Sequence, residues 1–101
     1  MTPLTNAQRK YLRSKAHRLK PLVLVGKQGI TDTLIRSVDT NLDAHELIKI
    51  RFNDHKDEKK VLAQEIVERT ESDLAGLIGH VAIVYRPHKD PEKREITLPK
   101  A

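Results

Sequence analysis

The chain has 101 residues, of which 33% are charged and 38% are hydrophobic, and it contains no cysteine. We expect residues 1–101 to form a single domain, because this length suffices for one ordinary core and not for two. The lack of cysteine excludes disulfides, thiolate metal sites and a cysteine nucleophile. The apolar runs are far shorter than the roughly 20 residues that cross a bilayer, and no signal-peptide pattern is present, so we expect a cytoplasmic protein with no membrane partner.

Positive charge is concentrated in the first third of the chain. The net charge is +5, and residues 1–31 contain seven Lys or Arg and no acidic residue, whereas the other 70 residues carry twelve bases and fourteen acids. This distribution is typical of a protein with a polyanionic partner. Only 3% of the residues are aromatic, which leaves little material for stacking bases, so nucleic-acid binding would depend on phosphates.

The N-terminal segment predicts a basic helix. Thr5 and Gln8 have the spacing of a capping box, so the helix begins there. Pro21 ends it, because the residue before a proline is driven out of helical backbone. The apolar positions of this segment share one face, and a neighbouring arc carries its cationic side chains, which are Arg9, Lys10, Arg13, His17 and Lys20.

Beyond this helix, the pattern alternates between periods typical of strands and of helices. In chain order we expect a strand over 22–25, a helix over 31–44, a strand over 47–52, a helix over 57–71, a strand over 80–85, a turn over 87–91 and a strand over 95–98. The predicted fold class is α/β of the two-layer α+β type, ordered α-β-α-β-α-β-β, with a four-stranded mixed sheet. Mostly parallel pairing is expected, with the last two strands antiparallel.

The segment Gly26-Lys27-Gln28-Gly29 connects the first strand to the second helix. Free backbone amides and a helix dipole can face an anion at such a position, and glycines allow a phosphate to approach closely. A tight strand-to-helix turn without a ligand is an equally simple interpretation of the spacing. The same spacing recurs in Gly76-Leu77-Ile78-Gly79, which we interpret as a packed turn because its interior is apolar and a strand follows.

The basic helix would extend the cationic surface if it packed beside this loop. A solvated helix face is the usual explanation for a run of charges. The absence of any acidic residue before Asp32 argues against that explanation, because a merely solvating helix normally mixes both signs.

Enzyme motifs are absent from the sequence. There is no GxxxxGK[ST] and no GxGxxG, so nucleotide hydrolysis and dinucleotide binding are unsupported. The five histidines show no metal-ligand spacing, and we interpret them as surface or partly buried residues: His17, His45, His55, His80 and His88. We therefore expect no catalytic residue, no metal, no cofactor and no small-molecule substrate.

Four separated motifs span nearly the whole chain in order: QRKYLR at 8–13 with Ala16-His17, PLVLVGKQG at 21–29, AHELIKI at 44–50, and IGH at 78–80 continuing to YRP at 85–87. Together they resemble the CRM domain of the chloroplast RNA splicing and ribosome maturation family, in its single-domain bacterial, YhbY-type form. The resemblance implies a fold like the C-terminal domain of translation initiation factor three, with an accessory N-terminal helix.

The resemblance also implies RNA binding and association with precursors of the large ribosomal subunit, including its ribosomal RNA (pre-50S particles). The family's loop falls on Gly26, Lys27, Gln28 and Gly29, and its basic helix on Arg9, Lys10, Arg13 and His17. We expect a monomer without catalytic activity. An alternative is an adaptor that docks on a ribosomal protein with secondary RNA contact, and a third hypothesis is an RNA-processing enzyme.

Overall fold

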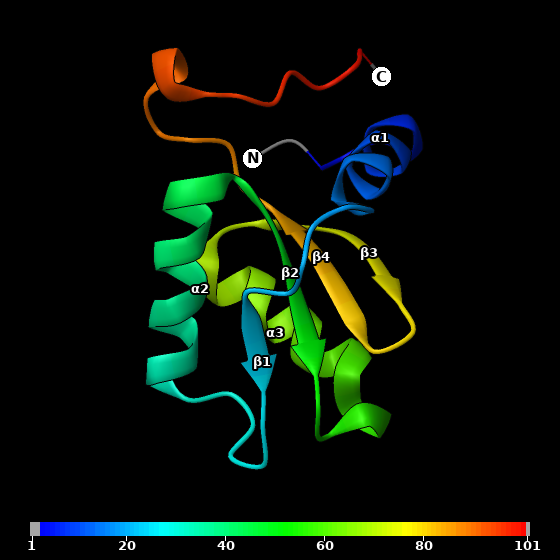
Figure 1. Cartoon of the computed structure of the whole chain (residues 1–101), viewed down its shortest axis with the longest axis vertical. Helices are drawn as coiled ribbons and strands as arrows, with labels where there is room; N and C mark the ends of the chain where they lie inside the picture. Colours follow the sequence, from blue (N-terminus) through cyan, green and yellow to red (C-terminus); the bar gives the residue numbers. More distant parts are fainter. Residues whose placement is uncertain (1–2, 101) are drawn as a thin grey trace.

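The computed structural model describes residues 3–100 and shows a sheet with helices on both faces (Figure 1). The elements in chain order are α1 (Asn6–Ala16), β1 (Val23–Val25), α2 (Asp32–His45), β2 (Leu47–Phe52), a 3-10 turn (Lys56–Glu58), α3 (Lys59–Thr70), β3 (Asp73–Ile78), β4 (Val81–Tyr85) and a second 3-10 turn (Pro91–Lys93). The predicted class, a mixed α+β fold with a four-stranded mixed sheet, is confirmed.

The strands lie in the order β1-β2-β4-β3. β1 and β2 are parallel, whereas β4 is antiparallel to both β2 and β3. The expectation of mostly parallel pairing is therefore wrong. The reason is that β3 and β4 form a hairpin, and a tight turn can join only antiparallel strands.

The identity of the fourth strand also differs from the expectation. Residues 95–98 form no strand, and the fourth strand of the sheet is β3, which comes before β4 in the chain. Gly76 lies inside β3, and only Gly79, with φ +57°, belongs to the hairpin turn, so the interpretation of 76–79 as one packed turn is wrong. A register shift between Leu74 and Gly76 interrupts the alternation that would have revealed the strand.

Two apolar clusters cover the two faces of the sheet. On one face, α2 and α3 pack on Val25, Ile50, Phe52 and their neighbours. On the other face, Leu12 and Ala16 of α1 pack on Leu47, Ala75, Ile83 and Tyr85, together with Ile96 and Leu98 of the C-terminal segment. The sheet is thus covered fully by α2 and α3 and only in part by α1.

Helix α1 begins as predicted and ends early. The Thr5 hydroxyl accepts from the Gln8 amide at 3.1 Å, and the Gln8 side chain accepts from the Thr5 amide at 3.0 Å, which is a complete capping box. The helix stops at Ala16 rather than at Lys20, because the chain must turn to join β1, where the Leu22 amide donates to the Lys49 carbonyl. In residues 3–100, no helix is long and apolar enough to cross a membrane.

Candidate functional site

Residues 26–29, the GKQG loop, form a tight turn that projects from the end of β1 (Figure 1). The Gly29 amide donates to the Gly26 carbonyl at 3.0 Å, and Gly29 has φ +67°, a conformation that favours glycine. The side chains of Lys27 and Gln28 are exposed. Within residues 3–100 the backbone amides of Lys27 and Gln28 have no acceptor, so one loop amide is consumed internally and two remain free for an anion.

The N-terminus of α2 contributes less to this site than its position suggests. The Thr31 hydroxyl caps the helix by accepting from the Leu34 amide at 3.0 Å. Asp32 lies in the first turn and pairs with Arg69 at 2.9 Å. Its negative charge offsets the positive end of the helix dipole. An anion at the loop would therefore be held by the loop amides and by the ammonium group of Lys27.

His55 supports the GKQG loop from the segment that follows β2. Its Nε2 lies 2.7 Å from the Lys27 carbonyl oxygen, and the ring lies 3.6 Å from the position of a Cβ on Gly29. The amides of Asn53 and Asp54 donate to the Val25 carbonyl at 3.0 and 3.2 Å, just before the loop. Sequence reasoning treated His55 as an ordinary surface histidine, since no spacing signal connects residue 55 with residue 27.

A second cationic group, which sequence reasoning also missed, lies where β2, α3 and the β3–β4 turn meet. Lys59 donates to the Gly79 carbonyl and lies 3.3 Å from Nδ1 of His80. Desolvation and the positive charges of Lys59, Lys56 and Arg51 lower the pKa of His80. Arg51, Lys56 and Lys59 therefore place positive charge near His80, outside the basic N-terminal segment, in a stretch of chain that also carries Asp54, Asp57 and Glu58.

The structure does not bring the basic helix beside the GKQG loop. Figure 1 shows the loop at the lower end of the long axis and α1 in the upper half. Leu12 and Ala16 hold α1 on the face opposite α2 and α3, so the helix contacts β2, β3 and β4 instead. The basic helix was expected to extend the cationic surface of the GKQG loop only if it packed beside that loop. Because it packs elsewhere, its cations do not adjoin the loop.

The predicted cations of this segment have different surroundings. Arg13 donates to the Ala75 carbonyl at 3.2 Å and lies over Gly76, where an added Cβ would be only 2.7 Å from its Cδ. Arg9 donates to the Asn6 side chain at 3.3 Å, and Lys10 is exposed. His17 and Lys20 are exposed beyond the end of α1. In the described chain, no group of three or more His, Asp or Glu could hold a metal ion.

Residues 4–86 match the model of the CRS1/YhbY (CRM) domain. The chain belongs to the CRM family. The matched region includes α1, the GKQG loop and all four strands, and it ends at Arg86, just after β4.

Bacterial relatives of this CRM chain match it over most of their own length. A Bacillus subtilis protein named "Probable RNA-binding protein YqeI" is 37% identical over 95% of this chain and 99% of its own. A Haemophilus influenzae protein named "RNA-binding protein" is 33% identical over 99% of both chains. The solution structure of SAV1595 from Staphylococcus aureus superposes with a TM-score of 0.81 at 40% identity, over 95% of this chain and 99% of that one.

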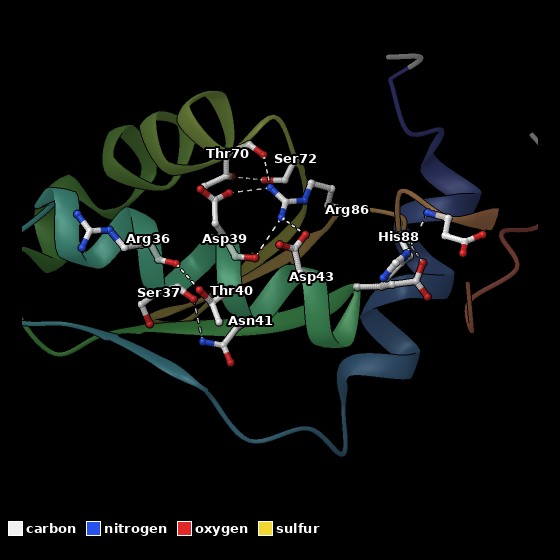
Figure 2. A network of polar contacts seen from close by, with 12 residues as sticks. Arg36, Ser37, Asp39, Thr40, Asn41, Asp43, Thr70, Ser72, Arg86 and His88 are labelled. Carbon is white, nitrogen blue, oxygen red and sulfur yellow. Dashed lines mark hydrogen bonds and ion pairs between the residues drawn. The ribbon is translucent and has the colours of Figure 1, made fainter. Parts of the chain in front are cut away.

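Two charged residues of the matched CRM motifs, Arg86 and Glu46, have structural roles. Figure 2 shows Arg86 at the centre of a network that joins β4 to α2 and to the end of α3. Its guanidinium donates to Asp39 and to the Thr70 carbonyl, both at 2.7 Å, and to Asp43 at 2.9 Å. This network fixes the helices that cover one face of the sheet.

Glu46 ends α2 and holds the C-terminal segment. It is 3% exposed and has φ +61°. Its carboxylate accepts from the amides of His88 at 2.8 Å, Glu95 at 2.7 Å and Ile96 at 3.2 Å. Three charge-assisted bonds compensate its burial. Glu46 and Arg86 therefore maintain the CRM fold and lie apart from the GKQG loop.

Proposed function

We propose that this CRM protein binds RNA as an assembly factor on precursors of the large ribosomal subunit, and that the GKQG loop holds an RNA phosphate. The names of the bacterial relatives support RNA binding. The observation that carries the site is the pair of free amides at Lys27 and Gln28, presented beside a mobile ammonium group and held in place by His55. Such amides and a lysine are the groups that bind phosphate in turns.

The cations of the N-terminal segment remain candidate contacts for more distant parts of the same RNA. Arg9, Lys10, Arg13, His17 and Lys20 would follow its backbone on the other half of the molecule. In this proposal the protein acts in the cytoplasm as a monomer, and it binds without altering the RNA. Incubation of structured RNA with the purified protein and Mg²⁺ should leave the RNA intact.

Two substitutions test whether the GKQG loop binds a phosphate. Lys27→Gln removes one charge, so the slope of log affinity against log salt should become shallower by about 0.7 to 0.9. Gly26→Asp places a negative side chain where an added Cβ meets nothing within 4 Å, so it should weaken binding while the unfolding midpoint stays near that of the wild type. Gly29 is a poorer choice, because its φ of +67° would strain any side chain.

The matched control is Lys93→Gln, an exposed lysine in the second 3-10 turn at the end of the molecule opposite the loop. Equal effects of Lys27→Gln and Lys93→Gln would show that the loop has no special role. The choice of RNA is tested separately by crosslinking in cells and sequencing of the attached RNA. Enrichment of large-subunit precursor RNA supports the assembly role, and its absence contradicts it.

A further inference from the structure

Helix α1 leaves the end of its sheet face nearest the GKQG loop uncovered. The strand register places Leu24, Arg51, Val81 and Ile78 in one row across β1, β2, β4 and β3. Leu24 is 55% exposed and Ile78 is 59% exposed. Lys49 lies two residues before Arg51 on β2 and so shares its face of the sheet. Leu22, which is 48% exposed, precedes β1. We name these six residues the open sheet face: Leu22, Leu24, Lys49, Arg51, Ile78 and Val81.

The charges on this face are all positive. In the described chain no carboxylate lies within ion-pair distance of Arg51 or Lys49. The Lys49 ammonium contacts the His17 carbonyl at 3.4 Å. A hollow of about 190 Å³ runs between the face and α1 and is lined by Arg13, His17, Lys49, Ile78, Val81 and Ile83. Exposed aliphatic groups among cations without acidic partners fit an anionic ligand that also has apolar surfaces.

The open sheet face continues directly from the GKQG loop. Leu24 precedes Gly26 by two residues, and Arg51 is its neighbour across the β1–β2 pair. Lys59 lies beside His80 at the same end of the sheet, and Arg51 and Lys56 are near enough to act on the same imidazole. The row crosses four strands, a width of about 14 Å at the usual strand spacing. It then reaches Ile78, which lines the same hollow as Arg13 and His17.

We infer that the open sheet face binds a short run of unpaired nucleotides that leads from the GKQG loop toward α1. This inference rests on the proposed function of the loop. Arg51 and Lys49 pair with backbone phosphates, while Leu24, Val81 and Ile78 contact ribose and the faces of the bases. Unpaired RNA is favoured over a duplex because only unstacked bases offer their faces to side chains. Aliphatic contacts tolerate any base, so binding is only weakly selective for sequence.

The main test is the double substitution Leu24→Thr with Ile78→Thr, which removes two apolar contacts without changing charge or the preference for strand structure. Affinity for a single-stranded oligonucleotide should fall on the order of tenfold, because aliphatic contacts are weaker than the stacking measured for aromatic residues. The salt slope and the affinity for a duplex should stay unchanged. The matched control is Val61→Thr on α3, which is 71% exposed on the opposite side of the sheet.

A charge substitution gives an independent readout. Arg51→Gln should reduce the salt slope for the single strand by about 0.7, the contribution of one phosphate contact. Thermal unfolding of all variants should stay near the wild type, because the substituted side chains are exposed.

The outcomes separate this inference from the proposed function. If Lys27→Gln weakens binding and the sheet variants bind the single strand like the wild type, the inference is overturned and the loop proposal stands. If Lys27→Gln also has no effect, the proposed function fails. If the double variant keeps its RNA affinity but loses a ribosomal protein that the wild type binds, the face is a protein dock and the inference is wrong.

Discussion

The imidazole of His55 donates a hydrogen bond to the carbonyl oxygen of Lys27 across 2.7 Å. Because a carbonyl only accepts, the proton must lie on Nε2 of the ring. The bond joins the segment after β2 to the GKQG loop and fixes the peptide whose neighbouring amides are free. His55 is therefore a positioning residue for the GKQG loop, the proposed phosphate-binding site.

His55→Ala should weaken RNA binding about fivefold, which corresponds to the loss of roughly 1 kcal/mol for one hydrogen bond. The salt slope should not change, because Lys27 remains. His55→Gln keeps a side-chain N–H and should restore part of the affinity. Fluorescence titration at several salt concentrations measures both quantities. His45→Ala, at the exposed end of α2, is the control, and an equal loss there would contradict the role of His55.

Gly76 and Arg13 should be energetically coupled. Gly76→Ala places a Cβ 2.7 Å from Cδ of Arg13, so the arginine must move and lose its bond to the Ala75 carbonyl. We expect a loss of about 1 kcal/mol in the free energy of unfolding. In an Arg13→Ala background the same substitution should be neutral or stabilising, because alanine is better than glycine in a strand. A double-mutant cycle in urea measures the coupling, and strict additivity would disprove the contact.

Arg86→Gln should destabilise the fold. The substitution leaves Asp39 and Asp43 without their cation and removes a donor from the Thr70 carbonyl. We expect a loss of about 2 to 3 kcal/mol, below the range for a fully buried ion pair, since the Arg86 side chain is 16% exposed. Arg36→Gln, on the exposed side of α2, should change stability by less than about 0.5 kcal/mol. Under folding conditions, RNA affinity should be the same for both variants and the wild type.

Asp73 should make stability depend on pH. Burial raises the pKa of Asp73 above its usual value of 3.8, and Arg9 opposes that change only in part. The unfolded chain therefore ionises at lower pH than the folded protein. This carboxyl group reduces stability as the pH rises from below 3.8 through the folded-state pKa, and the loss then stays constant.

The comparison with Asp73→Asn isolates this effect. The asparagine variant lacks the loss, so its stability relative to the wild type should increase as the pH rises from below 3.8 and should level off above the folded-state pKa. Urea unfolding at a series of pH values provides the measurement. Asp57→Asn, at an exposed position before α3, controls for the charge change. A difference between Asp73→Asn and wild type that does not vary with pH would contradict the burial effect.

Local signals predicted most elements of the fold. The capping box at Thr5, the N-cap at Thr31 and the alternation over 47–52 each depend on residues a few positions apart, and all three are present. Strand β3 escaped prediction because its glycine and its register shift serve a distant partner. Gly76 makes room for Arg13, which is 63 positions earlier, and no local pattern records such a requirement.

In the candidate site, too, features set by neighbouring residues could be predicted and features set by distant residues could not. The GKQG loop could be found from its glycines and from its place between a strand and a helix. Its relation to α1 could not, because the face of a sheet that a helix covers is decided by the complete apolar core. His55 was missed because its partner, the Lys27 carbonyl, is 28 positions earlier. Arg51, Lys56 and Lys59 lie close together in the sequence, but acidic residues alternate with them and their neighbour His80 comes from the β3–β4 turn.

The C-terminal segment is tied down at two points, by the Glu46 carboxylate at Glu95 and Ile96 and by the Gln8 side chain, which donates to the Pro99 carbonyl at 3.1 Å. The segment between these points lies at the upper end of the long axis in Figure 1, away from the GKQG loop. A dye or an affinity tag attached after Pro99 would therefore leave the loop unobstructed.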